Sequence, residues 1–133
     1  KSDPSDLSRI NMTDSKDQIV NKIKKAKTDN DLLPSTDKDI HKRPELENLL
    51  GIYSSLKKQS LSESINEFSE KTFSDLKQKL TDVLVEKISP ISSEINKLQK
   101  DSKFIDNVLQ EGAQKAEEIA KKKVKELKKI IGF

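Results

Sequence analysis

The stretch that decides the fold is residues 72–100, TFSDLKQKLTDVLVEKISPISSEINKLQK. Its apolar side chains recur every three or four residues, which is the spacing of one face of an α-helix. Thr72 followed by Asp75 is a helix-start signal. Pro90 predicts a kink, because proline removes one backbone hydrogen bond and clashes with the preceding turn. The apolar face comprises Phe73, Leu76, Leu80, Val83, Leu84, Ile88, Ile91, Ile95 and Leu98.

A second long helix is predicted from about Ser102 to just before Gly132, a natural C-cap. Gly112 in its middle favours close approach of another helix, with a break in the helix as the alternative. Apolar stripes on helices of about 28–30 residues, or about 43 Å, are buried only against partners. The predicted fold class is therefore all-α, an antiparallel helical bundle with two long C-terminal helices. The stripe comprises Ile105, Leu109, Gly112, Ala116, Ala120, Val124, Leu127 and Ile131.

Three shorter helices are predicted upstream of the long ones. Pro44 suits a first helical turn, where its missing N–H costs nothing, and Ser60 with Glu63 forms a capping-box pattern. The first predicted helix covers residues 15–27, with Asp14 as its N-cap. The other two predicted helices cover residues 44–57 and residues 61–69.

The remaining segments are predicted to be connectors. Residues 28–43 are polar, and only Leu32, Leu33 and Ile40 offer apolar anchors. Residues 1–13 are predicted to form a loop with one short extended piece. We therefore divide the chain into a connector, residues 1–13, and a helical domain, residues 14–133.

The composition fits either a disordered chain or an elongated helical protein. High charge with few aromatic residues alone leans towards disorder, so the apolar pattern must decide. Charged residues make up 37% of the chain and apolar residues 32%, with four Phe and one Tyr. The basic residues are 24 Lys and two Arg, and lysine suits non-specific contact with phosphates. There is no cysteine, which excludes a disulfide framework and a thiol nucleophile.

Two basic clusters are candidate phosphate-binding surfaces. The predicted helix at residues 15–27 has a local charge of +4, and residues 113–133 also sum to +4. Each phosphate contact would release counterions and make binding sensitive to salt. A solvated helix face is the alternative for both clusters. The candidate phosphate contacts are Lys22, Lys24, Lys25, Lys27, Arg43, Lys115, Lys122, Lys125 and Lys129.

A complete active site is not expected within these residues. His41 is the only histidine and has no second histidine or cysteine with which to share a metal, so no metal site is predicted. The carboxylates lie among lysines on helix faces, where solvated ion pairs are the usual explanation. There is no glycine-rich phosphate loop.

Four segments resemble bacterial tryptophanyl-tRNA synthetases, in their alphaproteobacterial and mitochondrial branch. KSDPSDLSRINMTDS at residues 1–15 is similar to the segment that begins inside the family's KMSKS signature. RPELENLLGIYSS at residues 43–55 is similar to its RP-x-x-x-N-L-L-x-I-Y-S pattern. The long proline-containing helix and the closing helix with its Gly-Phe end complete the resemblance, which covers all 133 residues.

The resemblance implies a function. It implies that Lys1 and Ser2 are the end of KMSKS, with Lys1 neutralising ATP phosphates as pyrophosphate leaves. It also implies a preceding Rossmann catalytic domain, ATP and Mg²⁺ for the full-length enzyme, and homodimerisation largely through that domain. The chain itself is expected to hold no cofactor, to be inactive alone, and to bind the anticodon region of tRNA(Trp). The loop before the long helix, SEKTFSDLK, departs from the glycine-containing stretch of many relatives.

Two alternatives remain open at the level of sequence. A helical scaffold without an RNA role would explain the charged helices, although Pro90 breaks the register of a long coiled coil. A tyrosine-specific relative fits the KSD start but fits residues 43–56 and the C-terminal ending poorly. No apolar run approaches about 18 residues, so no membrane partner is expected and the expected location is cytoplasmic.

Overall fold

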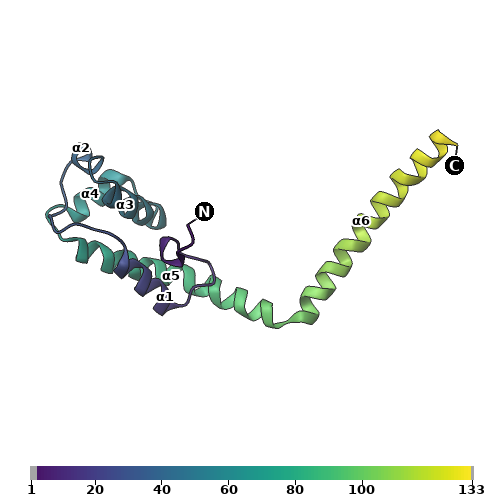
Figure 1. Cartoon of the computed structure of the whole chain (residues 1–133), viewed down its shortest axis with the longest axis horizontal. Helices are drawn as coiled ribbons and strands as arrows, with labels where there is room; N and C mark the ends of the chain where they lie inside the picture. Colours follow the sequence, from purple (N-terminus) through teal and green to yellow (C-terminus); the bar gives the residue numbers. More distant parts are fainter. Residues whose placement is uncertain (1–2, 133) are drawn as a thin grey trace. The chain divides into compact units, whose positions relative to one another are not determined.

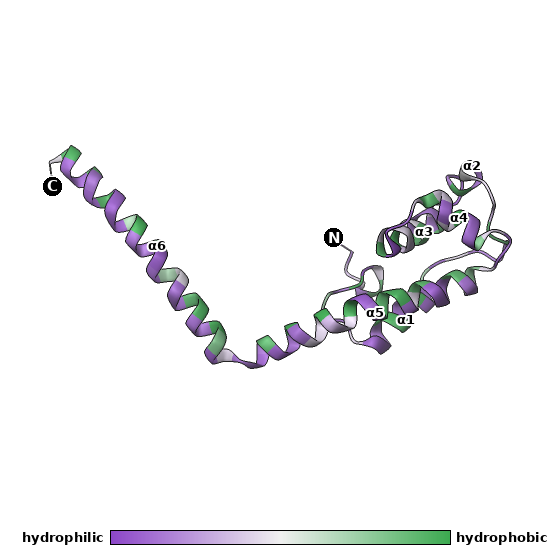
Figure 2. Ribbon diagram, turned by 180° about the vertical axis from the view of Figure 1, so that it is seen from behind, coloured by the Kyte–Doolittle hydropathy of each residue, from purple (hydrophilic) through white to green (hydrophobic). Residues whose placement is uncertain are grey.

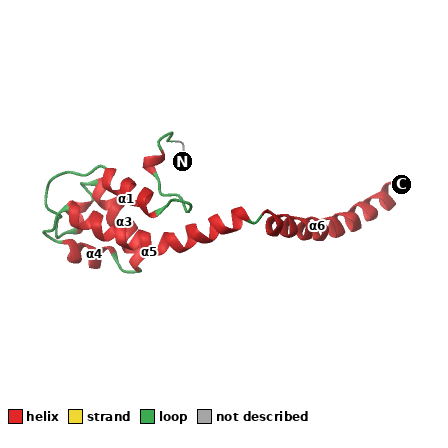
Figure 3. Ribbon diagram, turned by 90° about the horizontal axis from the view of Figure 1, so that it is seen from below, coloured by secondary structure: helices red, strands yellow, loops and turns green. Residues whose placement is uncertain are grey.

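A computed structural model describes residues 3–132, except the side chain of residue 37, and these residues form helices and loops without any strand (Figures 1 and 3). The predicted all-α class is therefore confirmed. The elements are η1 (Asp6–Ser8), α1 (Lys16–Lys25), α2 (Asp37–Ile40), α3 (Pro44–Lys57), α4 (Leu61–Phe68), α5 (Phe73–Lys100) and α6 (Ser102–Ile131).

The chain divides into two compact units, Lys1–Ser93 and Glu94–Phe133. The first unit contains η1, the four shorter α-helices and most of α5. The second contains the end of α5 and all of α6. The predicted division at residue 13 concerns the link to a preceding domain and stays a prediction.

The first unit is built around one hydrophobic core. Tyr53 and Phe68 are nearly completely buried and pack edge to face, with ring centroids 5.0 Å apart. The apolar face predicted for α5 is buried from Phe73 through Ile88, whereas Ile91 beyond it is 44% exposed. The core comprises Ile19, Ile23, Leu33, Ile40, Leu46, Leu49, Leu50, Tyr53, Ile65, Phe68, Phe73, Leu76, Leu80, Val83, Leu84 and Ile88.

The start of α1 differs from the prediction by one residue. Ser15, rather than Asp14, is the N-cap, and it forms a reciprocal capping box with Gln18. The carboxylate of Asp14 instead turns back and accepts a hydrogen bond of 2.9 Å from the backbone amide of Asn11. The prediction of Asp14 as N-cap was therefore wrong, because two adjacent residues both have capping side chains and only one can fill the position.

Helices α3 and α4 lie where the sequence predicted them. α3 begins at Pro44, and Ser60 and Glu63 form the expected capping box of α4. The connector is more ordered than predicted, since it includes the short helix α2. Leu33 and Ile40 anchor it in the core, whereas the third expected anchor, Leu32, is 59% exposed.

Helix α6 runs without interruption through Gly112 and ends at Gly132, whose φ of 84° is a left-handed C-cap. The alternative of a break at Gly112 was therefore wrong. No residue of α6 is buried, and hydrophobic and hydrophilic residues alternate along it (Figure 2). Burial of its apolar stripe in a bundle stays a prediction.

Candidate nucleic-acid interface

The first predicted basic cluster contains one lysine that does not face solvent. The side chain of Lys22 is only 5% exposed and is buried together with Ile19 and Ile23 of helix α1. Its Nζ atom is 2.7 Å from Oδ2 of Asp14 and 2.8 Å from Oδ2 of Asp6. The ammonium group is thus committed to two carboxylates and does not contribute to the exposed basic surface.

The charges of this network stabilise one another. Burial alone would raise the pKa of Asp14, but hydrogen bonds from Lys22 and from the Asn11 amide outweigh it and lower the pKa. Burial alone would lower the pKa of Lys22, but its hydrogen bonds to Asp14 and Asp6 outweigh that effect and raise the pKa. Both groups are therefore charged near neutral pH.

Arg43 is also engaged within the protein. Its guanidinium group pairs with both carboxylate oxygens of Asp29 and donates a hydrogen bond of 2.8 Å to the carbonyl oxygen of Leu32. The same group lies 5.1 Å from the centre of the Phe73 ring, a cation–π contact. Since the side chain is 18% exposed, its main visible role is to hold the connector against the start of α5.

The other predicted lysines of the first cluster are exposed. Lys24 and Lys25 form no salt bridge within the described part of the chain, and Lys27 pairs with Glu45 at 3.0 Å while its side chain stays 86% exposed. The hydrogen bond from Lys27 lowers the pKa of Glu45. The exposed basic group at the end of α1 therefore comprises Lys24, Lys25 and Lys27.

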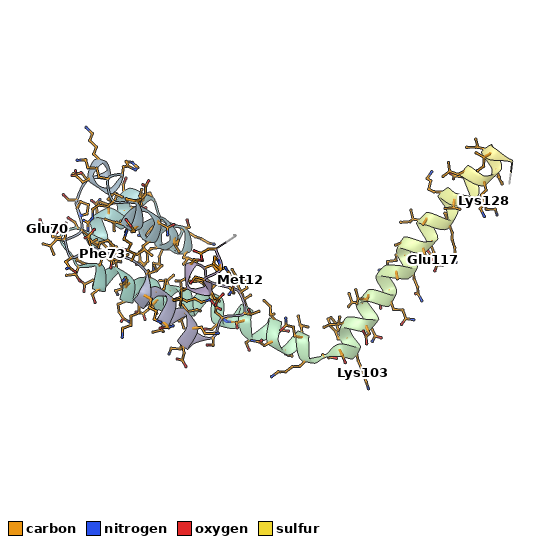
Figure 4. All side chains as sticks on the ribbon, viewed as in Figure 1. Met12, Glu70, Phe73, Lys103, Glu117 and Lys128 are labelled. Atoms are coloured by element: carbon orange, nitrogen blue, oxygen red, sulfur yellow. The ribbon has the colours of Figure 1, made fainter. Side chains whose placement is uncertain are left out.

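The second cluster is more open. Lys115, Lys122, Lys125 and Lys129 are all exposed on α6, and among residues 3–132 none of them has a salt bridge. Other lysines of the region pair with glutamates on their own helix: Lys97 with Glu94, Lys121 with Glu117 and Lys123 with Glu126. Side chains such as Glu117 and Lys128 project away from the α6 ribbon (Figure 4). The four unpaired lysines are separated by seven, three and four residues, so they share one helix face.

The described residues offer little else for chemistry. No group of three or more His, Cys, Asp or Glu side chains among them is arranged to hold a metal ion. His41 is exposed, and its Nδ1 atom lies 2.9 Å from Oε1 of Glu47. Lys1 and Ser2, the residues expected at the ATP phosphates, lie outside the described residues. No described helix has the length and apolarity needed to cross a membrane.

The network around Lys22 was missed by counting charges. A signal was available, because Lys22 lies three residues after Ile19 and next to Ile23, and both isoleucines are buried. A lysine between such positions lies at the edge of the packed face of its helix. A buried ammonium group needs anionic partners, and the nearby segment supplies Asp6 and Asp14.

Comparisons with known proteins show which family this chain belongs to. The family model for class I tRNA synthetases (W and Y) matches residues 1–90. The chain is 47% identical over all 133 residues to a tryptophan–tRNA ligase of Rhizobium meliloti, 42% to that of Rickettsia typhi and 40% to that of Caulobacter vibrioides. The whole chain is covered each time, but it spans only 38–40% of the length of these relatives. The chain therefore belongs to the class I tRNA synthetase family (W and Y).

Proposed function

We propose that this chain is the C-terminal region of a tryptophan–tRNA ligase, an enzyme that uses ATP to attach tryptophan to tRNA(Trp). The observation that carries the proposal is the 40–47% identity along all 133 residues to ligases of that name. In such an enzyme this region would bind the tRNA, while a preceding Rossmann domain activates tryptophan. The full-length enzyme is proposed to be cytoplasmic and homodimeric through that domain.

Lys1 and Ser2 are the proposed link to catalysis. As the end of a KMSKS loop, Lys1 would place a positive charge at the phosphates of ATP as pyrophosphate leaves. The proposal places ATP and Mg²⁺ mainly in the preceding domain. On this proposal the chain alone does not form tryptophanyl-adenylate.

The exposed lysines are the proposed RNA contacts. Exposed lysines reach solvent directly, whereas Lys22 and Arg43 are held in internal ion pairs. The exposed lysines are therefore better placed for phosphates than Lys22 or Arg43. Lysine makes point-charge contacts that position RNA without reading its sequence. Loops or helix ends would then have to read the anticodon. The proposed phosphate contacts are Lys24, Lys25, Lys27, Lys115, Lys122, Lys125 and Lys129.

The proposal is tested by binding of tRNA(Trp) to this chain, compared with an anticodon-swapped tRNA(Trp), across a series of salt concentrations. We expect a preference for the native anticodon that persists as salt rises, on top of a salt-dependent phosphate contribution. Equal and steeply salt-dependent binding to both RNAs would contradict anticodon recognition by this region. Concentration-dependent self-association without RNA binding would instead support the helical scaffold.

A further inference from the structure

The segment between Ser2 and α1 is folded around a single ammonium group. Lys22 projects from the middle of α1 and receives one carboxylate from η1, that of Asp6, and one from the residue before the N-cap, that of Asp14. Asp14 and Lys22 are 4% and 5% exposed. Two points of the segment, eight residues apart in sequence, are thereby fixed to the same atom of α1.

Asn11 ties these two points to each other. Its side-chain Nδ2 atom donates to Oδ1 of Asp6 at 2.9 Å and to Oδ1 of Asp14 at 3.4 Å. Its backbone amide donates to Oδ2 of Asp14 at 2.9 Å, and its carbonyl oxygen accepts from the Asp14 amide at 3.0 Å. Each carboxylate around Lys22 therefore has a further partner, which orients it.

Arg9 extends the network to the first described residue. Its guanidinium group lies 3.4 Å from Oδ1 of Asp6 and donates a hydrogen bond of 3.0 Å to the carbonyl oxygen of Asp3. The side chain of Asp3 in turn accepts from the amide of Ser5 at 2.7 Å. A continuous chain of polar contacts thus runs from Lys22 on α1, through Asp6 and Arg9, to Asp3.

We propose that Lys22 is a positioning residue for the tryptophan-activation step. By holding Asp6 and Asp14, it fixes the segment from Asp3 to Asp14. It thereby fixes the point where the ATP-contacting Lys1 and Ser2 join this segment. This inference rests on the proposed function for the role of Lys1 and Ser2, but the anchoring itself rests on the contacts of Lys22. Without the ammonium group, two carboxylates close to one another would repel and release the segment. A catalytic group misplaced by about 1 Å can lose on the order of 100-fold in rate.

Lys77 provides a matched control. The Lys77 residue is half-buried, and its Nζ atom donates hydrogen bonds to the carbonyl oxygens of Ala26 at 2.8 Å and Lys24 at 3.3 Å. Lys77→Met thus removes an ammonium group that braces the same helix, α1, at the end away from the segment. Any effect of Lys22→Met that Lys77→Met lacks is specific to the segment.

The anchoring is tested first by hydrogen–deuterium exchange on the chain. We expect Lys22→Met to speed amide exchange at least tenfold in residues 5–14, with Lys77→Met leaving exchange there unchanged. Asp6→Asn is a milder variant, since Asp6 is 54% exposed and its loss leaves the Lys22–Asp14 pair in place. It should speed exchange in the same residues by a smaller factor. Unchanged exchange in residues 5–14 of a folded Lys22→Met chain would overturn the inference.

The positioning role is tested in the full-length ligase by tryptophan-dependent ATP–pyrophosphate exchange. We expect Lys22→Met to lower kcat at least tenfold with little change in the KM for tryptophan, Lys22→Arg to restore part of the rate, and Lys77→Met to keep the wild-type kcat. Absence of exchange by the wild-type ligase would refute the proposed function. A normal wild-type rate together with equal kcat for Lys22→Met and Lys77→Met would refute the positioning role alone.

Discussion

The backbone amide of Glu70 donates a hydrogen bond of 2.9 Å to the carbonyl oxygen of Leu33, and the amide of Leu33 donates one of 2.9 Å to the carbonyl oxygen of Lys71. This pair of bonds fastens the connector to the loop between α4 and α5, with the side chain of Leu33 buried below it. To make its bond, Glu70 adopts a φ of 60°, in the left-handed region. The loop thus combines two favourable hydrogen bonds with a backbone conformation that costs a residue with a Cβ atom about 1–2 kcal/mol.

Glu70→Gly is expected to stabilise the first unit. Glycine adopts a positive φ at no steric cost, and its greater freedom in the unfolded chain offsets only part of the gain. The expected increase in the free energy of unfolding is about 1 kcal/mol, measured by urea denaturation. Ser69→Gly is the control, because Ser69 has a φ of −50° and gains nothing from glycine. A Glu70→Gly variant no more stable than the wild type would contradict the strain at this position.

The sequence predicted the helices of this unit where a local signal was strong. α3, α4 and α5 follow from Pro44, from the Ser60–Glu63 capping box and from the apolar period after Thr72. The connector carries no such period, because Leu33 is held by bonds to a loop almost 40 residues further along. Pairing over that distance leaves no trace in a short window of sequence, which is why the order of the connector and α2 were missed.

The candidate site shows the same limit. Counting charges found the lysines of α1 and α6, among which Lys25 and Lys122 are exposed. It could not show which cations are paired, because pairing depends on side chains that the fold brings together, such as Arg43 with Asp29. The exposed and unpaired cations, rather than the net charge, define the surface available to a polyanion.

Asp14→Asn is expected to destabilise the chain in a pH-dependent way. At pH 7 the free energy of unfolding should fall by roughly 2 kcal/mol. Breaking a fully enclosed ion pair costs ~3–5 kcal/mol, and the loss here is smaller because Asp6 still faces Lys22. The pKa of Asp14 is lowered by folding, so its charge stabilises the native state above the ordinary value of 3.8. This contribution is lost as the pH falls through the lower pKa of the folded state.

Urea denaturation of the wild type and of Asp14→Asn from pH 7 to pH 2.5 measures this difference. The difference in the free energy of unfolding between the two proteins should be constant above about pH 5 and should shrink below pH 3.8. Asp17→Asn, an exposed aspartate in the first turn of α1, is the control and should show a much smaller gap. A gap for Asp14→Asn that does not depend on pH would mean that the carboxylate charge is not the stabilising feature.

Replacing Lys122, Lys125 and Lys129 by alanine is expected to weaken tRNA(Trp) binding and to flatten its salt dependence. These lysines have no salt bridge within residues 3–132, so each is free to contact a phosphate. Each lost contact lowers the slope of log K against log salt by about 0.7–0.9, so three lost contacts lower it by about 2–3. Alanine preserves the helix, so circular dichroism should be unchanged.

The control for this variant removes the same charge from paired lysines. Lys97, Lys121 and Lys123 lie in the same unit, but each is bound to a glutamate on its own helix. Their replacement by alanine should reduce the salt slope less than the first triple variant does. Equal binding by the Lys122, Lys125 and Lys129 variant and the wild type would remove this face of α6 from the proposed RNA surface.

Gly112→Ala distinguishes an open helix face from a packed one. α6 is helical on both sides of Gly112, and a Cβ atom built there meets no described atom within 4 Å apart from the adjacent backbone of α6 itself. Alanine is preferred over glycine by about 1 kcal/mol inside a helix, so the variant should raise the midpoint of thermal unfolding measured at 222 nm. Ala113→Gly, the neighbouring reverse change, should lower it. A lower midpoint for Gly112→Ala would instead mean that another helix approaches α6 closely at this residue, because only the absence of a Cβ atom permits such an approach.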